Sequence, residues 1–260
     1  MTKTNGTGNH EDDENEGAPS NVSRFPTQEE RREIERMKAA MKKAQEQAAK
    51  PPSEPVLNLP PVVKALSGLL LLVHIVLSLV PEDLKLEVWK LGAFIPARYT
   101  LPEIPLDAGA FLSPVGHMFL HGGWLHIGMN IGMFLAFGSG IEKTVGGKKL
   151  LLIFFASGVL GLLFHMVVYP SDLHPLIGAS GGISGLFGAF LIMASDRGMM
   201  GDGTGGWRKL APVVAICVLS FLLFGFFGVP GESGQIAWTV HVAGFFAGLF
   251  LFRPIDRLRI

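Results

Sequence analysis

Four polar side chains stand inside long apolar stretches of this chain. Ser180 begins one stretch, within Gly178-Ala179-Ser180-Gly181-Gly182, and His241 lies inside a later one. His126 and Asn130 are four residues apart in a third stretch. Polar and ionisable groups in membrane-spanning segments are costly and mark candidate functional sites. Together the four residues predict a serine hydrolase whose site lies within a bilayer.

A serine hydroxyl is a weak nucleophile and needs an adjacent base. His241 can take the proton of Ser180 and later return it to the leaving amine. The apolar stretch that holds His241 contains no carboxylate, and the nearest acids, Asp172 and Glu232, lie in predicted loops. The pattern therefore favours a Ser–His dyad over a triad.

The charge that forms on the substrate carbonyl oxygen needs fixed hydrogen-bond donors. His126 and Asn130 share one helix face, because residues four apart are neighbours on a helix. The backbone N–H of Ser180, at a helix N-terminus, adds a third donor and a favourable dipole. We expect these three residues to form an oxyanion hole.

Six apolar stretches must position these side chains. They cover roughly Val62–Val80, Gly123–Ile141, Leu150–Tyr169, Ile177–Ala194, Ala211–Val229 and Ile236–Phe252. Each is close to the ~20 residues that span a bilayer core of ~30 Å. The sequence therefore predicts an all-α membrane protein with six transmembrane helices. A soluble protein with six buried helices is the alternative.

Lysine and arginine in the short loops set the orientation. Basic residues follow the second, fourth and sixth stretches: Lys143, Lys148, Lys149; Arg197, Arg208, Lys209; and Arg253, Arg257, Arg259. Both termini are then cytosolic. Counting back from Ala194 at 1.5 Å per residue puts Ser180 about 7 Å below the outer boundary, and His241 reaches a similar depth. The site should open to the outer side.

The chain divides into two regions of different composition. Residues 1–60 are polar and form a largely disordered cytosolic tail, in which Thr27-Gln28-Glu29-Glu30 predicts a capping box and a helix over 28–50. Residues 61–260 form the membrane domain. The long segment from Pro81 to Gly122 carries several apolar side chains, so we expect it to fold back against the membrane face; a plain spacer is the alternative.

Composition excludes several function classes. The formal net charge is +0, so no basic excess suggests a nucleic-acid partner. Cys217 is the only cysteine, which excludes an intrachain disulfide or a cysteine metal cluster. We expect no metal and no cofactor. The expected partners are the lipid bilayer and transmembrane protein substrates.

Small residues indicate how two of the helices meet. Gly181 and Gly185, and likewise Gly244 and Gly248, repeat every four residues and let helix backbones approach closely in lipid. Close approach would bring Ser180 to His241, although packing without catalysis explains the pattern equally well. The Gly-x-Ser-x-Gly elbow of α/β-hydrolases is rejected, because no strand pattern precedes it.

From about Ser113 onward the chain resembles the rhomboid family of intramembrane serine proteases, in its six-helix bacterial form. The matching motifs are His117-Met-Phe-Leu-His121-Gly-Gly-Trp-Leu-His126-Ile-Gly-Met-Asn130, Glu142, Gly178-Ala-Ser180-Gly181, and His241-Val-Ala-Gly244 with Gly248. The resemblance implies Ser180 as nucleophile, His241 as base, and an oxyanion hole of His126, Asn130 and the Ser180 amide. It implies cleavage of peptide bonds in or near transmembrane segments, in the inner membrane of a bacterium.

Two positions depart from the family pattern. Leu112-Ser113 stands where many members carry Trp-Arg, a structural motif of the family, so the departure questions how the loop is anchored and not the chemistry. Ser184 stands where the family often has an aromatic residue that packs against the catalytic histidine. The resemblance then implies either a less tightly stacked His241 or a hydrogen bond from Ser184 nearby. A catalytically inactive relative that binds membrane proteins is the alternative function. Such relatives typically lose the serine or the histidine, and both are present here.

Four further residues have weaker interpretations. His117 and His121 line a water entrance to the site in one interpretation and pack within the loop in the other. We expect Glu142 to form an ion pair with a neighbouring lysine or arginine at the cytosolic end. His165 matches no motif and is interpreted as an incidental polar group.

Overall fold

The computed structural model describes residues 25–48, 58–199, 207–227 and 237–260. They fall into two units that divide between Leu57 and Asn58. The first unit contains α1 (Gln28–Ala48). Its capping box is formed: the Thr27 N–H donates to the Glu30 carboxylate at 2.7 Å, and the Glu30 N–H donates to Thr27 Oγ1 at 3.3 Å. The tail before Phe25 lies outside the described residues, and its expected disorder stays a prediction.

The second unit is a bundle of long apolar helices. They are α2 (Pro61–Leu79), α6 (Trp124–Val145), α7 (Gly147–Val168), α8 (Ser180–Asp196), α9 (Trp207–Phe227) and α10 (Trp238–Asp256). All of these except α8 are long and apolar enough to cross a membrane. Helix α8 has 17 residues and starts at Ser180, not at Ile177 as expected. Within the described ranges the long elements are all helical, so the predicted all-α membrane bundle is confirmed.

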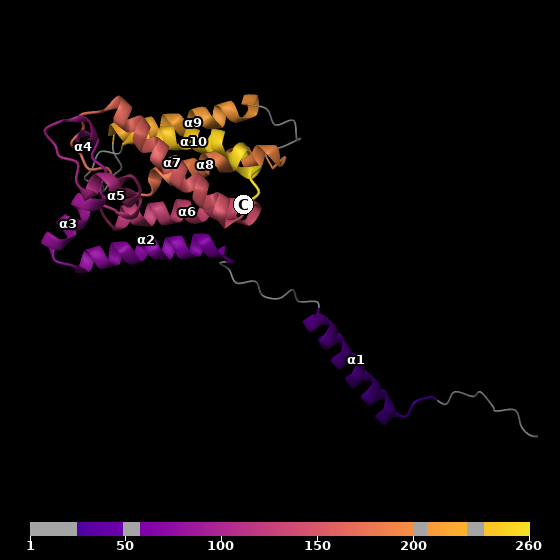
Figure 1. The fold of residues 1–260 in the computed structure, drawn as a ribbon. Helices are drawn as coiled ribbons and strands as arrows, with labels where there is room; N and C mark the ends of the chain where they lie inside the picture. The colour runs from indigo at the N-terminus through magenta and orange to yellow at the C-terminus, as the bar shows by residue number, and fades with distance from the viewer. Residues whose placement is uncertain (1–24, 49–57, 200–206, 228–236) are drawn as a thin grey trace, which may run out of the picture. The chain divides into compact units, whose positions relative to one another are not determined.

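Helix α8 is the centre of the bundle. It packs against α6, α7 and α10, and Figure 1 shows it running among them. Its side chains are buried along nearly the whole length, including Ile183, Leu186 and Ile192. Helix α8 is therefore held by contacts with three neighbouring helices, and its first residue, Ser180, starts from this packed element.

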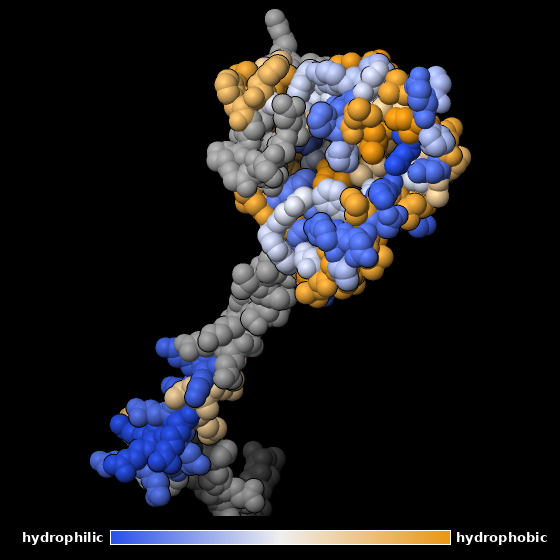
Figure 2. Space-filling model, turned by 90° about the vertical axis from the view of Figure 1, so that its left-hand side faces the viewer, coloured by the Kyte–Doolittle hydropathy of each residue, from blue (hydrophilic) through white to orange (hydrophobic). Residues whose placement is uncertain are grey.

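The segment between α2 and α6 folds back onto one end of the bundle. It forms α3 (Glu82–Gly92), α4 (Ala97–Thr100), α5 (Ala108–Gly116) and the 3-10 helix η1 (His117–Phe119). Phe94 pairs with Leu176 in an antiparallel bridge, and the Ala97 N–H donates to the Asp172 carbonyl at 3.0 Å. The segment is thus tied to the connection between α7 and α8. Figure 2 looks onto this end and shows polar side chains spread between apolar ones.

Buried polar contacts hold the folded-back segment together. Arg98 is 7% exposed, and its guanidinium donates to the Lys90 carbonyl at 2.9 Å, with the Asp107 carboxylate 3.7 Å away. The Tyr99 hydroxyl lies 3.0 Å from the Ser113 hydroxyl. Ser113 occupies the position where the resemblance predicts an arginine, so Arg98 and Tyr99 provide the anchoring in this chain.

The expectation for Glu142 was wrong. Its carboxylate accepts hydrogen bonds from the backbone N–H groups of Val62 at 2.9 Å and Val63 at 2.7 Å. Among the described residues these two bonds replace the expected ion pair. The first N–H groups of a helix lack intrahelical partners, and Pro60 at the N-cap of α2 offers no side-chain acceptor. Glu142 of α6 therefore caps α2 and joins the two helices.

Candidate active site

Ser180 and His241 meet at the end of the bundle where α8 begins. Ser180 is the first residue of α8, and His241 lies in the first turn of α10. The His241 Nε2 atom is 2.7 Å from the Ser180 Oγ atom. This distance is within the range of an O–H···N hydrogen bond. The two side chains are therefore placed as a nucleophile and its base would be.

Glycines make this approach possible. A Cβ added at Gly244 would collide with the carbonyl oxygen of Gly181, and one at Gly248 with that of Gly185. At Gly181 a Cβ would lie 2.8 Å from the Val240 side chain, next to His241 in sequence. Helices α8 and α10 thus touch backbone to backbone along the four glycines that the sequence singled out.

Gly178 is a site residue whose role the sequence pattern did not reveal. Its φ of +115° is a conformation that side-chain-bearing residues rarely adopt. A Cβ there would lie 2.8 Å from His126 Nε2 and 3.7 Å from Ser180 Oγ. Gly178 therefore lets the His126 ring approach the chain two residues before Ser180. The only signal in the sequence was a glycine in that position.

His126 and Asn130 lie on α6, which packs against α8. The ring of His126 borders Gly178, as described above, and its Nδ1 lies 3.4 Å from the Gly122 N–H. The Asn130 side chain is buried, and its amide donates to the His126 carbonyl at 3.0 Å. An amide carries two N–H donors, so this bond uses one of them. The structure brings His126 beside Ser180 and places Asn130 one turn deeper.

An aromatic residue of α9 takes the place next to His241. The ring centroids of Phe221 and His241 are 5.8 Å apart, and their planes make an angle of 51°. Ser184, where the resemblance predicts an aromatic residue, is buried in α8. Contact with an aromatic ring limits the movement of His241, but here the ring comes from a different helix than expected. Sequence periodicity does not reveal such a contact between separate helices.

His117 and His121 lie in the loop that covers this end. The His117 carbonyl accepts a hydrogen bond from the Gly178 N–H at 2.8 Å, which ties the loop to the segment before Ser180. Both side chains are buried, at 2% and 4% exposure. Burial lowers the pKa of His117 to about 4. Burial, together with the neighbouring His126, lowers the pKa of His121 to about 3. Both rings are therefore neutral near pH 7.

The carboxylate nearest to the site in the sequence has other partners. Asp172 contacts His165 Nε2 at 3.3 Å and His174 Nδ1 at 2.6 Å. Burial alone would raise the Asp172 pKa, but the hydrogen bonds from His174 and His165 outweigh it and hold that pKa below its usual value. In the part of the chain that the structure describes, no carboxylate contacts His241. Glu232, the other nearby acid in the sequence, lies outside the described residues, so within the described part of the site the contact is a serine–histidine pair with no carboxylate on the histidine.

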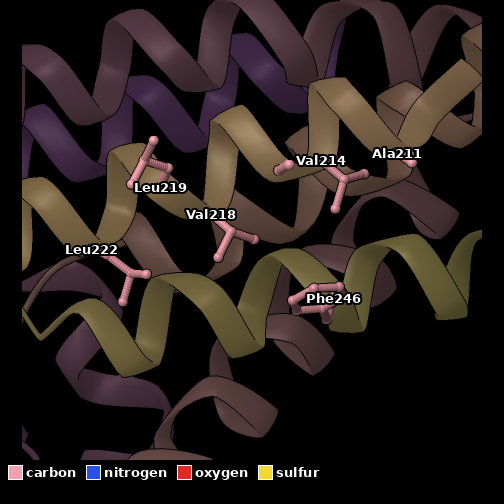
Figure 3. Close-up of a pocket in the computed structure, with 7 residues that line it drawn as sticks. Ala211, Val214, Val218, Leu219, Leu222 and Phe246 are labelled. Carbon is pink, nitrogen blue, oxygen red and sulfur yellow. The ribbon is translucent and has the colours of Figure 1, made fainter.

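A separate cavity lies between α9 and α10. It has a volume of about 530 Å³ and is lined by apolar side chains of α9 with Phe246 of α10. Figure 3 shows Val214, Val218 and Leu222 facing it. Its lining offers no nucleophile, acid or base. This cavity is therefore not a candidate active site.

The described helices form a membrane bundle, and a serine of α8 meets a histidine of α10 at one end of it. This combination places the protein in the class of rhomboid-like membrane proteins. The model of the rhomboid domain matches residues 109–255, more than half of the chain. This chain belongs to the rhomboid family.

Similar proteins come from animals and bacteria. Mouse rhomboid-related protein 2 is 30% identical over 151 residues, which cover 57% of this chain and 48% of that protein. The YdcA rhomboid protein of Bacillus subtilis is 36% identical over 134 residues, covering 52% and 62%. Rhomboid protease GluP of the same bacterium is 30% identical over 132 residues, covering 50% and 23%. The matched region thus spans less than two thirds of each relative.

Proposed function

We propose that this protein is an intramembrane serine endopeptidase. It hydrolyses peptide bonds in or near transmembrane segments of membrane-protein substrates, and its nucleophile and base are Ser180 and His241. The single observation that carries the proposal is the 2.7 Å contact between His241 Nε2 and Ser180 Oγ. Membership of a family whose matched members include a named protease supports it.

The proposed reaction uses each group in turn. Ser180 Oγ attacks the substrate carbonyl carbon while His241 Nε2 takes the hydroxyl proton. The negative charge on the carbonyl oxygen is stabilised by the Ser180 N–H, His126 and Asn130. The protonated His241 then donates its proton to the leaving amine, and an acyl-serine ester remains. Water attacks this ester with His241 again as base, which releases the new carboxyl end and restores Ser180.

The neighbours of the pair suit this chemistry. The first N–H groups of α8 have no intrahelical acceptor and point toward the end where Ser180 stands. The positive end of the α8 dipole favours a developing anion there. Neutral His117 and His121 beside the segment before Ser180 add no fixed positive charge. They are proposed to line the water entrance.

The orientation and location are proposals as well. We place both termini in the cytosol and the site toward the outer side, on the lysine and arginine distribution. The inner membrane of a bacterium is the expected location and stays a prediction.

The test combines cleavage with covalent labelling. A fluorophosphonate should modify Ser180 in the detergent-solubilised full chain, and peptide mapping should locate the adduct there. Ser180→Ala should abolish both labelling and cleavage of a membrane-protein substrate. His241→Ala should suppress both strongly, because the hydroxyl loses its base. Cleavage without an adduct on Ser180 would assign the nucleophile elsewhere. A folded protein with neither labelling nor cleavage would favour a membrane-protein binder without activity.

A further inference from the structure

His165 connects two elements that carry the proposed reacting groups. It lies in the last turn of α7 and is 4% exposed. Its Nδ1 atom is 2.5 Å from Thr239 Oγ1 in α10, and its Nε2 atom is 3.3 Å from Asp172 Oδ2 in the connection to α8. A buried histidine with both ring nitrogens engaged by different elements is not the incidental polar group that the sequence suggested.

The contact on the α10 side lies close to His241. Thr239 is the second residue of α10 and is fully buried, and it precedes His241 by two residues. One turn before His165, Gly161 faces α10: a Cβ there would lie 2.7 Å from the Val240 carbonyl oxygen. The α7 backbone and the His165 ring therefore define where the first turn of α10 lies.

The contact on the other side lies in the segment that leads to Ser180. Asp172 accepts a hydrogen bond from the His174 N–H at 2.9 Å, which makes a local turn. Its carbonyl accepts from the Ala97 N–H at 3.0 Å. Asp172 is thus fixed against α4 as well as against His165. Movement of the α7–α8 connection would pull on His165 and through it on α10.

The negative charge on Asp172 determines which ring nitrogen of His165 carries the proton. An ionised carboxylate only accepts hydrogen bonds, so the N–H of His165 must be on Nε2. His165 Nδ1 then accepts a hydrogen bond from the Thr239 hydroxyl. This arrangement resembles the way a carboxylate fixes the tautomer of a histidine in other sites, so that its second nitrogen has a defined role.

We propose that His165 is a positioning residue for the reaction: with Asp172 and Thr239 it holds the first turn of α10, and hence His241, in register with the segment that ends at Ser180. The inference rests on the proposed function. It predicts that losing the Thr239 hydroxyl misplaces His241 without removing any reacting atom. Misplacement of His241 by a fraction of an ångström lowers the catalytic rate more than it weakens substrate binding.

The decisive variants are Thr239→Val, which removes the hydroxyl at nearly constant volume, and Thr239→Ser, which restores it. Thr239→Val should lower kcat about tenfold with KM changed less than about twofold. Fluorophosphonate labelling of Ser180 should fall by a similar factor, because it needs the dyad but no substrate. Thr239→Ser should recover most of both rates. Asp172→Asn should lower them less than Thr239→Val, since it keeps an acceptor for His165 but loses the charge.

Thr100→Val is the matched control. The Thr100 hydroxyl donates to the Pro170 carbonyl at 2.5 Å, so it ties the same connection to α4 without touching α10. This variant should label and cleave as the wild type does. A Thr239→Val protein with wild-type rates overturns the inference. So does a loss of activity that Thr239→Ser fails to rescue, because that would be a purely structural effect.

Two further outcomes keep the tests separate. If Thr239→Val does not accumulate in the membrane, Asp172→Asn decides: unchanged labelling and cleavage overturn the inference, and a lowered kcat with unchanged KM supports it. If the wild type is neither labelled at Ser180 by the fluorophosphonate nor able to cleave substrate, the proposed function is wrong, and so is this inference. If the wild type is active and both variants match it, only the positioning role fails.

Discussion

The Nε2 atom of His241 lies 2.7 Å from the hydroxyl oxygen of Ser180, although 61 residues separate them in the chain. The contact depends on α8 and α10 touching at Gly181 and Gly244, where a Cβ would collide with backbone. The helix that carries the hydroxyl, α8, is packed against α6, α7 and α10. Proximity of this kind supplies much of the rate in enzymes that use a nucleophile and a base.

The oxyanion donors should affect turnover more than binding. Asn130→Ala should lower kcat by about 10²-fold or less, because one donor among several is lost. His126→Ala should behave similarly, and KM should change little, since the interaction forms mainly in the transition state. Steady-state cleavage of a membrane-protein substrate measures both constants. Met129→Ala, at an exposed position of the same helix, is the control and should match the wild type. A raised KM with unchanged kcat would make either residue a substrate contact instead.

Gly178 should not tolerate a methyl group. Gly178→Ala places a Cβ 2.8 Å from His126 Nε2, at a φ of +115° that alanine rarely adopts. We expect labelling of Ser180 to fall at least about tenfold, because the His126 ring or the segment before Ser180 must shift.

Gly128→Ala is the matched control for that change. Gly128 lies in α6 with nothing within 4 Å of an added Cβ, so alanine should leave the rate unchanged and stabilise the helix by roughly 0.5–1 kcal/mol. Equal labelling rates for Gly178→Ala and the wild type would show that Gly178 does not shape the site.

Part of this arrangement could be predicted from the sequence. The apolar stretches follow from hydropathy, and the positions of Ser180 and His241 within two of them predict a similar depth for both residues. The contacts of Gly178, Glu142 and His165 could not be predicted, because each joins elements far apart in the chain. Sequence pattern and periodicity predict which side chains share one face of a helix, but not which other element packs against that face.

Two departures from the family pattern show the same limit. Ser113 suggested that the loop lacks its anchor, yet Arg98 and Tyr99 provide one from elsewhere in the same segment. Ser184 suggested a less restrained His241, yet Phe221 of α9 lies beside it. Compensation between different helices is visible only once the chain is folded.

Glu142 should contribute to stability and not to chemistry. Glu142→Ala should destabilise the bundle by about 0.5–2 kcal/mol, the usual cost of losing a helix cap. Glu142→Gln should cost less, because its amide oxygen can still accept one of the two N–H groups of α2. Thermal unfolding in detergent measures the difference, with Lys143→Ala at the next, exposed position as control. An unchanged Tm for Glu142→Ala would contradict the capping role.

The orientation can be tested on the full chain with single cysteines. In a Cys217→Ala background, Leu173→Cys lies in the connection between α7 and α8, and Leu258→Cys lies after α10; both native side chains are exposed. A membrane-impermeant maleimide should label the first in intact cells and the second only after permeabilisation. The opposite pattern would overturn the orientation and, with it, the outward-facing site.

Acidification should destabilise the loop over the site. Burial lowers the pKa of His117 to about 4 and, with the nearby His126, that of His121 to about 3. The same side chains titrate near their ordinary value of about 6.5 when the chain unfolds. Between these values the unfolded state binds more protons than the folded state, so stability is complete above about pH 6.5 and falls below it. Each histidine removes up to about 1.4 kcal/mol per pH unit in that window.

The corresponding experiment compares Tm at pH 7.5, 6.0 and 5.0 in a detergent without titratable groups. The wild-type Tm should hold above pH 6.5 and then decrease. His117→Asn removes one titrating ring, and its amide can still donate to the Ser113 carbonyl that His117 Nδ1 meets at 3.0 Å. His121→Phe removes the other ring and keeps an aromatic side chain against His126, whose centroid lies 5.1 Å away. Each variant should reduce the acid dependence, and both together should reduce it further, since the two protonation costs are separate. A double variant as acid-sensitive as the wild type would locate the titrating groups elsewhere in the chain.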